Sequence, residues 1–383
     1  MFTTIDASSR SRGTVRLMRA LSLLFVLAVA FATLHPFSDW RPRTPSPFAF
    51  LHDGLPHWWT WFDLLSNVLA YGLLGLLLAL GWLGRLRPLP ATLLATLACA
   101  LLSVTLESLQ GYLPNRVPSL LDWIANTAGG FAGAWLGAML NRASHHGDRV
   151  AVPVHARWYE QGPPGGWVLL LLWLSAQLVP QRMMFATGQV RPLLQRALDG
   201  LALDEPVDLS AAIGRLWGDT PGASFGMAIE AASVLAATCA VGALVFALVQ
   251  GPRRRFVLLA SVALVAFGLR SIATQMIYVS ASPLAWLTPG VQGGLVVGAA
   301  LLYGIETLGP RGRATAAIVA TIAGTLLVNL APADPYFEST LAGLRDWQLE
   351  NLHGLLRTVS LVWPALAIAW FWHRTGRARR RSL

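Results

Sequence analysis

The sequence predicts an all-α membrane protein, a polytopic bundle of about ten transmembrane helices with both termini in the cytoplasm. Three observations support this fold class. Of the 383 residues, 55% are hydrophobic and only 13% are charged, whereas an ordinary soluble domain carries about 25% charged residues. Uncharged stretches of 19 to 22 residues recur along the chain, and roughly 20 apolar residues cross a bilayer. Arginine is concentrated on one side of the predicted helices.

The expected helices follow these uncharged stretches, because a charge at the bilayer centre is costly and is excluded from most spans. The stretch between Asp63 and Arg85 is one example, and the stretch between Glu230 and Arg253 is another. We predict helices near residues 17–36, 63–84, 91–110, 121–141, 166–180, 225–250, 256–279, 291–308, 314–331 and 357–373. A further short helix, lying on the membrane, is expected within residues 190–203.

The orientation follows from the basic residues, all of which are arginine. Of the 29 arginines, 19 fall in segments that would then face the cytoplasm and nine in outer segments, while Arg270 lies inside a helix. Positive residues are retained on the cytoplasmic side. The net charge of +10 therefore reflects topology, so we expect membrane lipids as partners and no nucleic acid. The first helix is expected to be retained, although its arginine-rich start resembles a signal peptide.

The predicted helices fall into two groups, separated by a proline-containing segment without apolar periodicity. We expect a cytoplasmic N-terminus (1–16), a four-helix membrane domain (17–141), a cytoplasmic linker (142–165), a six-helix membrane region (166–373) and a basic cytoplasmic tail (374–383).

Polar residues of the first group are expected to meet near the outer membrane surface. Two Asp-x3-Asn pairs begin the second and fourth helices, which run inward, and each Asn lies one turn deeper than its Asp. The third helix runs outward and places a Glu and a Gln near the same level. The candidate ligand-binding cluster consists of Asp63, Asn67, Glu107, Gln110, Arg116, Asp122 and Asn126.

A structural role and a functional role compete for this cluster. Each Asp-x3-Asn pair fits a helix N-cap followed by hydrogen bonds between helices. Glu107, in contrast, is an ionisable residue within a span and favours function. At that depth it needs donors, for which Arg116 and the asparagine amides are available. We expect no metal, because no His or Cys joins the carboxylates and Arg116 opposes a cation. No cofactor motif is present.

The cluster residues resemble the VanZ-like family. The resemblance is carried by Asp63-x3-Asn67, by Glu107-Ser-Leu-Gln110, and by Arg116-Val-Pro-Ser-Leu-Leu-Asp122-x3-Asn126 followed by Gly129-Gly130. It covers roughly residues 35–141, and Asp334-Pro-Tyr-Phe with 347–354 is similar to the tail of long, roughly ten-helix proteobacterial members. The resemblance implies a cell-envelope protein of the bacterial cytoplasmic (inner) membrane, with a link to glycopeptide antibiotic resistance. It does not imply a reaction.

Three function classes follow from these observations. The leading hypothesis is a protein that binds an amphiphile in the outer leaflet, either a lipid-linked envelope precursor or an amphiphilic, lipid-tailed antibiotic. The second is a membrane enzyme acting on such a lipid, with Glu107 as general acid or base, but the sequence offers no nucleophile and the catalytic residues stay unassigned. The third is a transporter, which needs a site near the membrane midplane, whereas this cluster lies near one surface.

Overall fold

A computed structural model of the chain describes residues 7–35, 37, 39–41, 46–56, 59, 61–82, 86–114, 116–145, 164–178, 183–201, 207–217, 223–277, 282–332 and 350–380. These residues form helices and irregular connections, and none of them forms a strand. The chain divides into two compact units, Met1–Glu160 and Gln161–Leu383. Each is described here by itself, and most of the predicted linker, residues 146–163, lies outside the described ranges.

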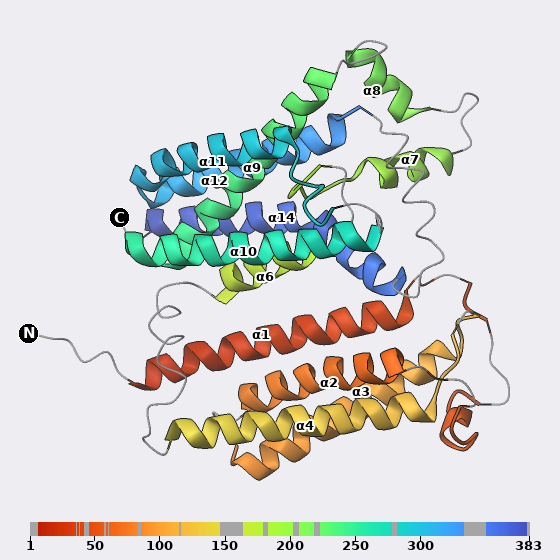
Figure 1. Cartoon of the computed structure of the whole chain (residues 1–383). Helices are drawn as coiled ribbons and strands as arrows, with labels where there is room; N and C mark the ends of the chain where they lie inside the picture. The colour runs from red at the N-terminus through yellow and green to blue at the C-terminus, as the bar shows by residue number, and fades with distance from the viewer. Residues whose placement is uncertain are drawn as a thin grey trace, which may run out of the picture. The chain divides into compact units, whose positions relative to one another are not determined.

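The first unit contains four long helices that run side by side (Figure 1). Helix α4 packs against α2 and α3, while α1 packs against α2 and α3. A 3-10 turn, η1 (Ala49–Leu51), lies in the connection between the first two helices. The helices are α1 (Ala7–Leu34), α2 (Trp61–Trp82), α3 (Pro88–Gln110) and α4 (Leu120–His145).

Glycine sets the close approach of α2 and α4. A Cβ added to Gly75 would overlap the backbone of Gly130, and one added to Gly133 would overlap the backbone of Gly72. In a lipid environment, helices associate through close packing more than through hydrophobic exclusion, so small residues at the contact favour it. The two helices that begin with the Asp-x3-Asn pairs are thereby held backbone to backbone.

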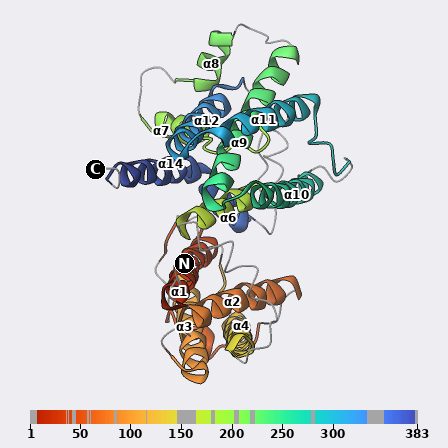
Figure 2. The ribbon, with the colours of Figure 1, turned by 90° about the vertical axis from the view of Figure 1, so that its left-hand side faces the viewer.

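The second unit is built around α9. Figure 2 shows α9 amid the other long helices of this unit, and 67% of its apolar window is buried, against 22–33% for the other five helices of comparable length and hydropathy. The long helices are α9 (Ala223–Leu248), α10 (Pro252–Ile277), α11 (Pro289–Thr307), α12 (Pro310–Leu330) and α14 (Glu350–Arg380), and α6 (Pro164–Ala176) is a shorter apolar helix.

Two short helices, α7 (Arg191–Asp199) and α8 (Leu209–Trp217), lie between α6 and α9 in the sequence. The helix expected within residues 190–203 is therefore confirmed as α7, whereas α8 was not predicted. The side chain of Asn329 holds the start of α7, because its Oδ1 accepts hydrogen bonds from the backbone N–H of Val190 and of Arg191, each at 2.8 Å.

Six of the described helices are long and apolar enough to cross a membrane. They are Asp63–Trp82, Pro88–Gln110, Ser224–Leu248, Pro252–Gln275, Pro310–Leu330 and Gly354–Thr375, and shorter apolar helices run from Met18 to Leu34 and from Gly165 to Ala176. The two other predicted spans correspond to α4 and α11. Both are rich in glycine and alanine, which are less hydropathic than leucine or valine, so neither stands out by hydropathy although each has the length to cross.

Candidate functional site

The candidate site lies at the end of the first unit where α2 and α4 begin and α3 ends. Asp63 stands in the first turn of α2 and Asp122 in the first turn of α4, while Glu107 stands in the last turn of α3. Because α3 runs opposite to α2 and α4, all three carboxylates gather at one end of the bundle. The two aspartates also complement the positive N-terminal ends of their helices.

Asn67 and Asp122 join α2 to α4. The amide Nδ2 of Asn67 donates to Oδ1 of Asp122 over 3.0 Å. Asp122 is half-buried and Asp63 is exposed, and the two lie close enough for their charges to interact. The pair of aspartates therefore forms the more accessible part of the cluster.

Glu107 is enclosed and holds the start of α4. Its side chain is 5% exposed, and Oε2 accepts a hydrogen bond of 2.9 Å from the backbone N–H of Ser119. The Ser119 hydroxyl in turn accepts from the backbone N–H of Leu121 and of Asp122, at 3.2 and 3.4 Å. The sequence suggested Arg116 or the asparagine amides as donors to Glu107, and the donor that the structure supplies is this backbone amide.

Ser119 is thus a site residue that the sequence reasoning missed. A signal for it exists, because Ser119 followed by Asp122 three residues later, ahead of an apolar run, matches the capping-box pattern. The hydroxyl caps the first turn of α4, and the same residue's N–H is oriented toward Glu107. Ser119 therefore connects the end of α3 to the beginning of α4.

Asn126 lies in a deeper layer of the same unit. Its Nδ2 donates to the Ser103 hydroxyl over 3.0 Å, and the two residues are 4% and 0% exposed. Tyr71, also buried, lies beside Ser103 and near Glu107. Within the part of the chain that the structure describes, Oδ1 of Asn126 has no hydrogen-bond partner. Buried polar groups are normally paired, so this oxygen marks a polar position beneath Glu107.

Gln110 and Arg116 each donate to a backbone carbonyl at the end of α1. Nε2 of Gln110 donates to the carbonyl of Thr33 over 3.4 Å, and the Arg116 guanidinium donates to the carbonyl of His35 over 3.5 Å. Both acceptors lie at the C-terminal end of α1, where the helix dipole favours a cation. The seven predicted residues therefore share one end of the unit but divide into a carboxylate group, a deeper asparagine and a pair facing α1.

Outside the cluster, the side chains of the described residues offer fewer candidates for a metal site or a nucleophile. Among the described residues, no group of three or more His, Cys, Asp or Glu side chains is arranged to hold a metal ion. The two cysteines, Cys99 and Cys239, are buried and unpaired by disulfide. Of the hydroxyl groups near Glu107, those of Tyr71 and Ser103 are enclosed, and the half-buried hydroxyl of Ser119 caps α4.

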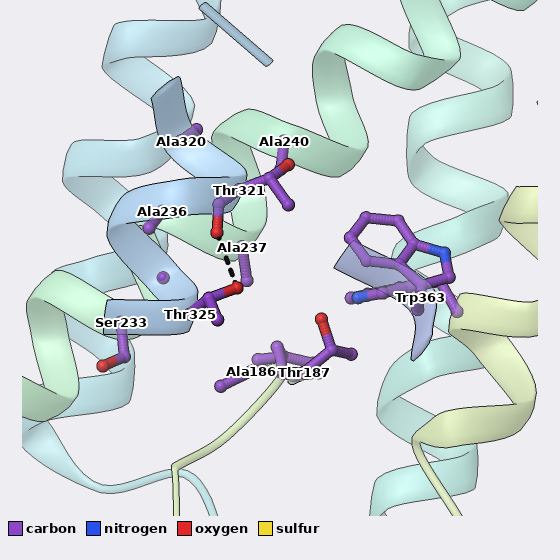
Figure 3. A pocket seen from close by; sticks show the side chains of 13 residues that line it. Ala186, Thr187, Ser233, Ala236, Ala237, Ala240, Ala320, Thr321, Thr325 and Trp363 are labelled. Carbon is purple, nitrogen blue, oxygen red and sulfur yellow. Dashed lines mark hydrogen bonds between the residues drawn. The ribbon is translucent and has the colours of Figure 1, made fainter. Parts of the chain in front are cut away.

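The second unit contains a cavity between α9, α12 and α14 (Figure 3). Thr187, Thr321, Thr325 and Trp363 line it together with several alanines. The Thr325 hydroxyl donates to the Thr321 carbonyl over 2.9 Å. The cavity has a volume of about 20 Å³, which is enough for a single water molecule. A lipid or antibiotic headgroup does not fit in this cavity.

Comparison with known proteins finds a family match in the first unit. The family model described as VanZ/LLP1 matches residues 6–141, a range that includes α1 to α3, most of α4 and all seven predicted cluster residues. The curated proteins and the solved structures gave no significant match. The helices of the second unit lie outside the matched range.

Proposed function

We propose that this VanZ-like membrane protein, whose residues 6–141 match the family model, binds an amphiphile whose headgroup enters the polar cluster of the first unit. The amphiphile is a lipid-linked envelope precursor or a lipid-tailed antibiotic. Its tail lies along the lipid-facing surface of the helices, and its headgroup meets the ends of α2, α3 and α4. A role in glycopeptide resistance follows if the bound amphiphile is the antibiotic or its target.

The observation that carries this proposal is the bond between Asn67 and Asp122. It fixes a half-buried carboxylate beside the exposed Asp63 at one end of an otherwise apolar bundle. Holding a carboxylate in one orientation lowers the entropic cost of binding a hydroxyl or ammonium donor. Sugar hydroxyls and amino groups supply such donors, and charge-assisted hydrogen bonds are about twice as strong as neutral ones.

Arg116 supplies the positive charge at the same end of the unit. A planar guanidinium matches the geometry of a phosphate or a carboxylate, so a headgroup with an anionic group and several hydroxyl or amino donors complements the cluster. Glu107 has a supporting role in this proposal. It is too enclosed to meet a headgroup directly, but through Ser119 it sets the position of Asp122.

We further propose that the four helices α1 to α4 of the first unit and the helices α6, α9, α10, α11, α12 and α14 of the second all cross the bacterial inner membrane, with both termini in the cytoplasm. The arginine distribution supports this orientation, because 19 of the 29 arginines fall on the side that would face the cytoplasm. The carboxylate cluster then opens toward the outer leaflet, where lipid-linked envelope precursors and externally added antibiotics are met.

Native mass spectrometry of the purified full chain tests the binding. The probes are a polyprenyl diphosphate that carries an amino-sugar headgroup and a lipid-tailed glycopeptide, added separately. Asp122→Asn keeps the acceptor for Asn67 but removes the charge, and we expect it to lower retention of the bound probe about tenfold. Asp53→Asn, which removes an exposed acid in the connection before α2, is the matched control. Equal retention by the wild type and both variants would reject the site.

A further inference from the structure

In the second unit, α10 and α12 begin at the end where α11 finishes (Figure 1), and arginines are concentrated in these turns. Five lie in the first turns of α10 and α12, and we call them the basic cluster. Its members are Arg253, Arg254, Arg255, Arg311 and Arg313. The single acidic residue among these turns is Glu306, near the C-terminal end of α11. Cations at helix N-termini oppose the helix dipole, so this placement needs a compensating negative charge.

Glu306 compensates only part of this charge. Its carboxylate pairs with the Arg255 guanidinium at 3.0 Å, and its backbone carbonyl accepts from Arg313 at 2.8 Å. Arg255 and Arg313 are close enough to repel each other across it. Two guanidinium groups from different helices thus meet at Glu306, one at its carboxylate and the other at its backbone carbonyl.

Arg313 carries an unmet donor. Its Nε–H is buried and has no acceptor in the part of the chain that the structure describes. The Nε–H of Arg255, in contrast, donates to the carbonyl of Val249 over 3.3 Å. The same guanidinium lies over the ring of Phe246. An anion that approaches Arg313 meets a positive field and a donor fork suited to phosphate oxygens.

The surroundings of the basic cluster are apolar. Phe256 is 72% exposed and Tyr303 is 78% exposed. Phe256 follows Arg255 directly on α10, and Tyr303 precedes Glu306 by one turn on the same face of α11. Leu308, also exposed, ends the same helix. Acyl chains can lie on these side chains, whereas a free phosphate ion gains nothing from them.

We propose that the basic cluster binds the phosphate of an anionic phospholipid, with Arg313 as its central contact and the exposed aromatic residues beside its acyl chains. Basic pockets between transmembrane helices are the sites that suit such headgroups. The site belongs to the second unit and does not depend on the amphiphile proposed for the first. The proposed topology places it in the cytoplasmic leaflet.

The test counts lipids on the detergent-purified full chain by native mass spectrometry, with dioleoyl phosphatidylglycerol and dioleoyl phosphatidylcholine as probes. We expect the wild type to retain phosphatidylglycerol in preference to phosphatidylcholine. Arg313→Gln should lower that retention about tenfold through loss of a charge-assisted contact. Glu306→Gln should raise it about threefold, because it removes the competing negative charge.

Arg87→Gln is the matched control. It removes one exposed arginine from the α2–α3 connection, on the side that would also face the cytoplasm, and should leave retention unchanged. If Arg87→Gln lowers phosphatidylglycerol retention as much as Arg313→Gln does, the attraction is a general property of the basic surface and the proposal is overturned. Displacement of phosphatidylglycerol by equimolar inorganic phosphate would also overturn it. If Arg313→Gln fails to fold, Glu306→Gln decides, and a folded variant without increased retention rejects the site.

Discussion

The amide of Asn67 and the carboxylate of Asp122, 55 residues apart in the sequence, are joined by a hydrogen bond of 3.0 Å. The bond locks the first turns of α2 and α4 together at the end where Glu107 and Ser119 meet. It also holds the Asp122 carboxylate close enough to Asp63 for the two charges to interact. A single side-chain contact therefore links the packing of the bundle to the shape of its polar end.

Asn67→Leu should destabilise the first unit more than Asp122→Asn does. Leucine leaves the half-buried Asp122 carboxylate without its donor, at a cost of about 1 to 3 kcal/mol, whereas asparagine at 122 still accepts the bond. Thermal unfolding in detergent measures the difference. Ser66→Ala, next to Asn67 and bonded only to the carbonyl of Asp63, serves as control. The reverse order of stability would contradict the pairing.

Glu107 should tolerate glutamine better than leucine. Glutamine retains an oxygen that accepts from the backbone N–H of Ser119, while leucine strands this buried donor at a cost of about 1 to 3 kcal/mol. Membrane yield should therefore fall for Glu107→Leu and hold for Glu107→Gln. If the wild-type chain confers resistance, a folded Glu107→Gln protein that no longer does so would show that the charge itself is needed. Normal yield and full phenotype for Glu107→Leu would exclude any polar role at this position.

Two glycines on α2 provide an internal comparison of helix packing. Alanine at 75 would drive its Cβ into the backbone of Gly130, whereas alanine at 72 would meet only the carbonyl of Gly129 at an ordinary 3.5 Å. We expect Gly75→Ala to separate α2 from α4 and to lower the unfolding temperature by several degrees, roughly as a loss of 1 to 3 kcal/mol would. Gly72→Ala should stay near wild type. Equal effects would mean that the two helices are not in backbone contact.

Reporter fusions test the proposed topology. Fusions after Arg142, Arg255 and Arg313 should report the cytoplasm, and fusions after Arg116, Asp204 and Asp346 should report the outer side. An alkaline phosphatase reporter, active outside, paired with a fluorescent protein that matures inside, measures each position twice. A consistent inversion at all six positions would place the carboxylate cluster in the cytoplasmic leaflet and overturn the outer-leaflet assignment.

The helices could be predicted because membrane spans are marked by the residues that they exclude. Each long described helix overlaps a stretch expected from the spacing of charges, since a charge in hydrocarbon costs far more than any local propensity gains. The boundaries were less accurate. Helix α1 begins at Ala7 and α14 extends to Arg380, because arginines at a helix end can extend toward the membrane surface while the backbone stays helical.

The site was only partly predictable. Alternating helix direction was enough to bring Asp63, Glu107 and Asp122 to one end of the bundle. The choice of hydrogen-bond partners was not predictable, because it depends on how closely glycine lets α2 approach α4. The acceptors of Gln110 and Arg116 are backbone carbonyls of α1, and no side-chain pattern reveals a carbonyl. Ser119 acts through its backbone N–H as well as its hydroxyl. The role of the N–H could not be predicted either, because every residue except proline has one.

The central position of α9 predicts an unusual pattern of mutational tolerance. Lipid tails are as apolar as leucine, so an enclosed helix gains little from being more hydrophobic than its neighbours. The close packing of its neighbours instead limits the size of the side chains that α9 can carry. Gly242 is an example, because a Cβ there would overlap the side chain of Leu302. A deep mutational scan should therefore find α9 sensitive to side-chain volume and nearly indifferent to exchanges among apolar residues of equal size. The outward faces of α3 and α10 should show the opposite, accepting any bulk and rejecting charge.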